Sequence, residues 1–80
     1  MPYVTEETRT RLADGGEPET PGEVNYALTR IITSYVARKG LSYATINDVL
    51  GALTGAREEF YRRVAAPYED DAIARNGDLY

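Results

Sequence analysis

Two long stretches of the chain repeat apolar residues at intervals of three and four, which is the spacing of one buried face of an α-helix. The first stretch carries Val24, Leu28, Ile31, Ile32, Tyr35 and Val36. The second stretch carries Ile46, Val49, Leu50, Leu53, Ala56, Phe60 and Val64. This pattern predicts an all-α fold that is organised around two amphipathic helices.

The first helix is expected over residues 20–40. Thr20 can accept a hydrogen bond from the amide of Glu23, the Glu23 carboxylate can reach back to the amide of Thr20, and Pro21 suits the first helical position. Gly40 is a typical stop, because glycine readily adopts the left-handed backbone conformation that ends many helices.

The second helix is expected over residues 45–66, since Thr45 repeats the capping pattern and Pro67 lacks the amide that a helix interior needs. Only residues 41–44 separate the two helices, and so short a connection makes neighbouring helices antiparallel. The sequence thus predicts an antiparallel two-helix hairpin with its apolar faces in contact.

The two ends of the chain flank this hairpin. Residues 1–19 form an N-terminal arm and linker, in which Thr5 is a candidate helix cap. Residues 68–80 form a C-terminal segment, with a short helix that stops at Gly77 and packs across the hairpin. All 80 residues then belong to a single helical domain.

The residue types present exclude several kinds of chemistry. The chain has no cysteine and no histidine, which removes disulfides, thiolate metal sites and the commonest general base. Glu58 and Glu59 are adjacent, so they point to different sides of a helix, and Glu69, Asp70 and Asp71 do not have the spacing of a calcium-binding loop. We expect no enzymatic activity, no cofactor and no metal site.

Charge is distributed unevenly along the chain, whose formal net charge is -4. Residues 24–67 carry six basic and three acidic side chains, whereas residues 1–23 and 68–80 are acidic. Duplex DNA is therefore an unfavourable partner, because its binding depends on many cations that meet phosphates. A small anionic ligand on the basic middle segment is compatible with this distribution. No apolar run approaches the ~20 residues of a membrane span, so we expect a cytoplasmic protein without a membrane partner.

Arginine and tyrosine at helical spacing form the candidate ligand-binding site. Arg57 and Tyr61 are four residues apart and share a helix face, on which a guanidinium can hold a phosphate while an aromatic ring stacks on a base. Arg62 adjoins them, and Tyr26 and Arg30 form a parallel pair on the first helix. The alternative is a solvated face on which these arginines pair with neighbouring acidic side chains.

Gly51 and Gly55 form a ridge of small residues within the second helix. A glycine inside a helix costs about 1 kcal/mol relative to alanine, so we expect a compensating close contact with another backbone. That neighbour is the first helix, a second copy in a homo-oligomer, or a ligand. The seven tyrosines also favour contact surfaces, and Tyr43 and Tyr68 are the candidate interface residues among them.

Five short runs of sequence carry a resemblance to a known family. They are Glu19-Thr20-Pro21-Gly22-Glu23-Val24-Asn25-Tyr26, Ile46-Asn47-Asp48-Val49-Leu50-Gly51-Ala52-Leu53, Glu59-Phe60-Tyr61-Arg62-Arg63, Pro67-Tyr68-Glu69 and Asn76-Gly77-Asp78. With these runs the chain resembles a family of small uncharacterised proteins of tailed phages and prophages, over nearly its whole length. The resemblance implies a phage setting in a bacterial host cell and attaches no function.

The expected shape is similar in architecture and size to phage counter-defence proteins, small oligomers of helical hairpins that sequester cyclic nucleotide immune signals. No binding residue is carried over from them. We therefore expect a non-enzymatic phage protein that forms a homo-oligomer and captures a small anionic nucleotide. The alternatives are a protein-binding inhibitor or adaptor that acts on a host protein, and a minor virion or assembly component.

Overall fold

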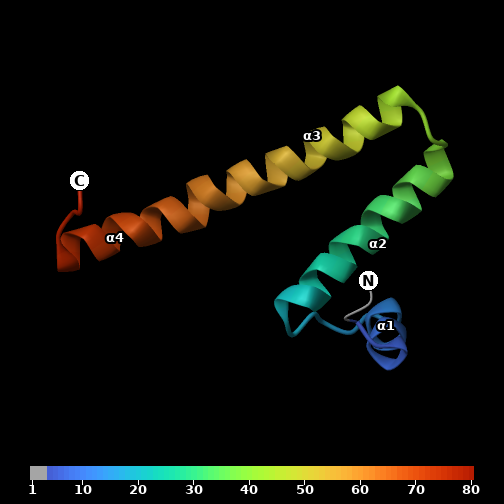
Figure 1. Ribbon diagram of the computed structural model, residues 1–80, viewed down its shortest axis with the longest axis horizontal. Helices are drawn as coiled ribbons and strands as arrows, with labels where there is room; N and C mark the ends of the chain where they lie inside the picture. The colour runs from blue at the N-terminus through green and yellow to red at the C-terminus, as the bar shows by residue number, and fades with distance from the viewer. Residues whose placement is uncertain (1–3) are drawn as a thin grey trace. The chain divides into compact units, whose positions relative to one another are not determined.

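The computed structural model describes residues 4–80, and every regular element in that range is helical (Figure 1). In chain order the elements are α1 (Glu6–Ala13), α2 (Pro21–Lys39), α3 (Tyr43–Phe60), the π-helix η1 (Tyr61–Ala65) and α4 (Ala66–Asn76). No strand occurs among the described residues. The prediction of an all-α fold is confirmed.

The chain divides into two units, which we call unit 1 (Met1–Thr45) and unit 2 (Ile46–Tyr80). The positions of the chain's parts relative to one another are not determined. The antiparallel contact between the two long helices therefore stays a prediction. Each unit has its own pattern of contacts.

Local hydrogen bonds close both ends of α1. The Thr5 hydroxyl accepts a hydrogen bond from the amide three residues further on (3.2 Å), which confirms the expected cap. At the other end, the amide of Gly16 donates to the carbonyl of Arg11 (2.9 Å), and the amide of Gly15 donates to that of Leu12 (3.2 Å). This pair of bonds is a Schellman motif, for which Gly15 provides the positive φ of 94°.

α2 begins and ends where the sequence predicts. The Thr20 hydroxyl accepts a hydrogen bond from the amide of Glu23 (3.1 Å), and Pro21 is the first helical residue. The Glu23 carboxylate accepts from the amide of Glu19 (3.1 Å), one residue before the partner that the capping box predicts. Gly40, with a φ of 86°, ends the helix.

Arg11 ties α1 to the start of α2. Its guanidinium donates to the Glu17 carbonyl (2.7 Å) and forms an ion pair with the Glu23 carboxylate. The Glu23 side chain is only 15% exposed, so water and salt screen this pair less than an ion pair on the surface. Among the apolar residues that the structure describes, Val4 is the only buried one. Polar contacts therefore contribute much of what holds unit 1 together.

α3 begins at Tyr43, two residues before the predicted boundary at residue 45. Its cap is Ser42, whose hydroxyl accepts a hydrogen bond from the amide of Thr45 (3.1 Å). Thr45 is buried in the first turn, with its own hydroxyl 3.1 Å from that of Ser42. The prediction that Thr45 is the cap is wrong, because a serine three residues upstream offers the same hydroxyl chemistry. Tyr43, expected in the turn, is the first residue of the helix.

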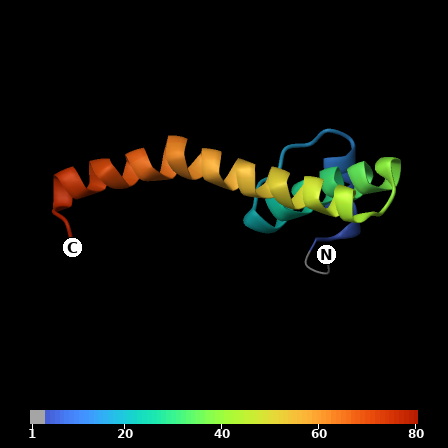
Figure 2. The ribbon, with the colours of Figure 1, turned by 90° about the horizontal axis from the view of Figure 1, so that it is seen from above.

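Pro67 does not end the second helix, and the prediction of a helix end at residue 66 is wrong. The backbone is right-handed helical at Phe60 and at Ala66, and the helix continues through η1 into α4 (Figure 1 and Figure 2). The amide of Ala66 donates to the carbonyl of Tyr61, five residues back, which is a π-helical bond. Pro67 follows as the second residue of α4, where the wider π turn before it tolerates its ring and its missing amide.

The C-terminal segment lengthens this helix and does not turn back across α3. α4 ends at Asn76, and Gly77 stops it as predicted, with a φ of 88° and an amide that donates to the carbonyl of Ile73 (2.8 Å). The short helix predicted after Pro67 is present as α4, but the prediction that it is separate from the second helix is wrong, because Pro67 does not interrupt the chain's helical course. Residues 43–76 form one helical run, which we call the long helix.

Candidate functional site

The principal candidate site is a line of apolar residues along the long helix. This apolar stripe consists of Ile46, Val49, Leu53, Ala56, Phe60, Val64, Tyr68 and Ala72. Phe60, Val64 and Tyr68 are 63%, 50% and 71% exposed. Single exposed apolar residues are ordinary on protein surfaces, but a contiguous line of them is typical of an interaction site.

The π turn keeps this stripe on one side of the helix. From Ile46 to Phe60 its members are alternately three and four residues apart, close to the 3.6 residues of an α-helical turn. From Phe60 to Ala72 every interval is four, which in an α-helix rotates each successive side chain by about 40° from the line. η1 takes an extra residue into one turn and removes most of that rotation. The stripe therefore continues across the junction into α4.

Three of the predicted ligand-binding residues lie on the long helix. Arg57 and Tyr61 are one turn apart at the end of α3 and the start of η1, and Arg62 follows them. Arg57 Nη1 lies 3.2 Å from Glu58 Oε1, and both side chains are well exposed. An exposed pair of this kind contributes at most about 1 kcal/mol, so it leaves Arg57 available to an anion. Within residues 46–80 the Arg62 side chain forms no ion pair.

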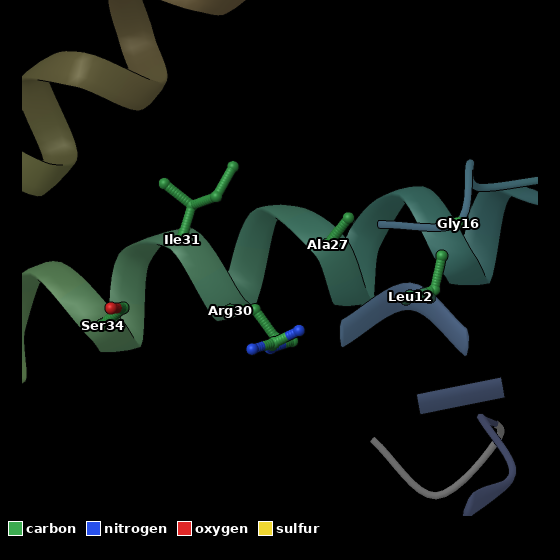
Figure 3. A pocket seen from close by; sticks show the side chains of 6 residues that line it. All are labelled: Leu12, Gly16, Ala27, Arg30, Ile31 and Ser34. Atoms are coloured by element: carbon green, nitrogen blue, oxygen red, sulfur yellow. The ribbon is translucent and has the colours of Figure 1, made fainter. Parts of the chain in front are cut away.

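The other two predicted ligand-binding residues, Tyr26 and Arg30, lie on α2 in unit 1. An open pocket between α1 and α2 is lined by Leu12, Gly16, Ala27, Arg30, Ile31 and Ser34 (Figure 3). Arg30 contributes its only charged side chain, while Tyr26 is half-buried and is not among the lining residues. The pocket combines one cation with an apolar wall.

The five predicted ligand-binding residues fall into two groups. Arg57, Tyr61 and Arg62 belong to unit 2, and Tyr26 and Arg30 belong to unit 1. Since the relative position of the units is not determined, a single site built from both groups stays a prediction.

The predicted interface residues are open to solvent. A Cβ added at Gly51 or at Gly55 would meet no heavy atom within 4 Å. Tyr43 and Tyr68 are 87% and 71% exposed. The close backbone contact expected at the glycine ridge, with the first helix or with a second copy, stays a prediction.

The part of the chain that the structure describes offers neither a metal-binding cluster nor a membrane-spanning helix. Residues 4–80 hold no group of three or more His, Cys, Asp or Glu side chains that could bind a metal ion. None of the described helices combines the length and the apolar character that a bilayer crossing requires.

Two structural features were not predicted from the sequence. Arg11 contacts Glu23 twelve residues away, and no local pattern indicates that pair. The π turn, in contrast, has a signal in the sequence: the apolar spacing changes to a constant four after Phe60, shortly before Pro67. The π turn lies where this change of spacing begins.

Comparison with known proteins identifies the family. Residues 1–79 match the family model described as a domain of unknown function, DUF6899. The chain belongs to the DUF6899 family. No curated protein and no solved structure matches it. Because the DUF6899 family is uncharacterised, the function of this DUF6899 protein has to be inferred from its own surfaces.

Proposed function

We propose that this DUF6899 protein is a non-enzymatic protein-binding module that docks through its apolar stripe. The observation that supports this most is the exposure of Phe60, Val64 and Tyr68 on consecutive turns of one helix. Full burial of such a side chain stabilises a complex by about 1.5–3 kcal/mol. An amphipathic helix that presents its apolar residues in one line typically binds a groove or another helix.

The hairpin that the sequence predicts is part of this proposal. α2 has 19 residues and is about 28 Å long at 1.5 Å per residue, whereas the long helix over residues 43–76 measures about 51 Å. An α2 that runs back antiparallel from Gly40 reaches about as far as residue 61. Val64 and Tyr68 therefore lie beyond its reach and are left for a partner.

We place this partner in the cytoplasm of a phage-infected bacterium, on the resemblance to phage proteins. There the module would act as an inhibitor or adaptor of a host protein. The absence of histidine and cysteine supports a binding role over a catalytic one.

Affinity capture with matched variants tests the docking function. The full chain is used as bait in a lysate of the bacterium that produces it, next to Val64→Lys on the stripe and Thr54→Lys on the polar side of the same helix. We expect a stoichiometric protein on the wild type and on Thr54→Lys, and a loss of at least about tenfold on Val64→Lys. Equal capture by all three baits, or no captured protein, would refute the docking function.

A small anionic nucleotide is the second candidate partner, and the position of Arg30 in the pocket between α1 and α2 favours it. Arg57 and Tyr61, one turn apart, offer a phosphate contact and a stacking ring elsewhere on the chain. Calorimetry against cyclic and linear nucleotides is the test, with Arg30→Ala expected to weaken binding about tenfold. No heat from any nucleotide at tens of micromolar protein would refute this candidate.

A further inference from the structure

A row of charged residues runs beside the second half of the apolar stripe. Glu59, Arg63, Pro67, Asp71 and Arg75 are spaced by four, so they follow one flank of the long helix through η1 and into α4. Their charges read negative, positive, neutral, negative, positive. When the row is turned end for end about its proline, every charge meets its opposite.

We propose that residues 59–75 pair antiparallel with the same segment of a second copy of the chain. This inference rests on the proposed docking function of the stripe: residues 59–75 dock onto a second copy, and the paired module is the form that would act on a host protein. In the pair, Arg63 faces Asp71 of the partner subunit, and Glu59 faces Arg75 of the partner subunit. Two-fold symmetry repeats both contacts at the other end of the segment.

The apolar residues beside this charged row are also complementary in size. About a centre one residue earlier, at position 66, Val64 meets Tyr68 of the partner subunit, and Phe60 meets Ala72 of the partner subunit, so that a large side chain faces a small one in the outer layer. The contact therefore covers Phe60, Val64 and Tyr68, which are exposed members of the stripe.

Contacts within the chain leave this charged row available. Arg63 Nε lies 3.5 Å from Glu59 Oε1, but these side chains are 75% and 62% exposed, and such pairs on one helix are weak. Arg75 Nε donates to the backbone carbonyl of Asp71 (3.3 Å), and within residues 46–80 the Asp71 carboxylate forms no ion pair. Both partners of the proposed Arg63–Asp71 contact can turn toward a second subunit at little cost.

Self-complementarity is the reason to choose a second copy over a different protein. A foreign helix would have to carry the reversed order of charges independently, whereas a second copy supplies it by symmetry. The charges also fix the direction, because only the antiparallel arrangement about Pro67 pairs all four with their opposites.

Sedimentation velocity on two charge-reversal variants and their mixture tests the pairing. The wild-type chain is expected to dimerise as its concentration rises. Arg63→Glu and Asp71→Arg each place like charges opposite one another and should each weaken the dimer at least about tenfold. An equimolar mixture should dimerise like the wild type, because the new carboxylate of one chain faces the new guanidinium of the other and the native pair is also kept.

Asp70→Arg is the matched control, since it makes the same charge change one residue earlier, about 100° around the helix and away from the stripe. It should leave dimerisation within about twofold of the wild type. A mixture that stays monomeric, with helix content unchanged by circular dichroism, overturns the pairing. A monomeric wild type whose Val64→Lys variant still loses its captured protein overturns the pairing alone. A monomeric wild type that captures protein equally with and without Val64→Lys overturns the docking function as well.

Discussion

Unit 1 and unit 2 differ in how their side chains find partners. In unit 1, Arg11 holds both the Glu17 carbonyl and the Glu23 carboxylate, and the hydroxyls of Thr5 and Thr20 close the starts of its two helices. Unit 2 is helical from its first residue to Asn76, and Phe60, Val64 and Tyr68 of its apolar stripe are exposed. The polar side chains named in unit 1 have their partners within the same unit, whereas the exposed apolar side chains of the stripe on the long helix are available to a partner.

This difference indicates which part of the chain gains stability from association with a partner. A chain of 80 residues is close to the size at which a single apolar core gives only marginal stability. Among its described apolar residues Val4 alone is buried, so burial of the stripe by a partner would add apolar stabilisation that the described contacts do not supply. We expect substitutions in unit 1 to change local stability and substitutions along the stripe to change association.

Removal of the Arg11 contacts should have the largest effect on stability. Arg11→Ala leaves the poorly exposed Glu23 carboxylate without its ion pair, and we expect a loss of about 2 kcal/mol in the stability of the α1–α2 contact. Urea denaturation followed by circular dichroism measures it. Arg9→Ala, on the exposed side of the same helix, is the control and should change stability by less than about 0.5 kcal/mol. An effect of Arg11→Ala no larger than that of the control would show that unit 1 is held by other contacts.

Substitution of Pro67 separates helix stability from stripe geometry. Pro67→Ala restores a backbone amide and removes the ring, so η1 should revert to α-helix and stabilise the long helix by about 1.5 kcal/mol, less than the cost of a proline in a helix interior. The same change rotates Tyr68 and Ala72 away from Phe60 and should weaken self-association about tenfold.

Thermal unfolding and sedimentation velocity measure the two effects of Pro67→Ala, with Pro18→Ala in the linker as the control. A more stable helix with undiminished self-association would show that the π turn has no part in aligning the stripe.

The glycine ridge should give the smallest effect. Gly51→Ala and Gly55→Ala each add a methyl group in open space and should each stabilise the long helix by about 1 kcal/mol. Because the proposed subunit contact spans residues 59–75, self-association should not change. Weaker association of either variant would instead place a close backbone contact at the ridge, as the sequence pattern suggested. Thermal unfolding and sedimentation equilibrium together distinguish the two outcomes.

The sequence predicted correctly those helix ends that depend only on neighbouring residues. The caps at Thr5 and Thr20 and the stops at Gly40 and Gly77 depend on residues within one helical turn, and the structure has all four. The rule that proline ends a helix gave the wrong result at Pro67, because the backbone widened ahead of it instead of turning.

The candidate site was predictable only in part. The apolar spacing indicated one face of a helix up to Val64, but the assumption of a helix end at Pro67 hid its continuation to Tyr68 and Ala72. The Arg11–Glu23 contact depends on how the linker between α1 and α2 folds, so no periodic pattern reveals it.

Amide hydrogen exchange over a dilution series is the most direct test of the central claim. It shows whether the long helix, unlike unit 1, depends on a partner for its protection. At high protein concentration we expect the amides of residues 62–76 to be protected, and on dilution we expect them to exchange much faster. The hydrogen-bonded amides of Gly16 and Val24 in unit 1 should keep their protection throughout. Protection of residues 62–76 that does not change with concentration would contradict the claim that a second subunit covers the stripe.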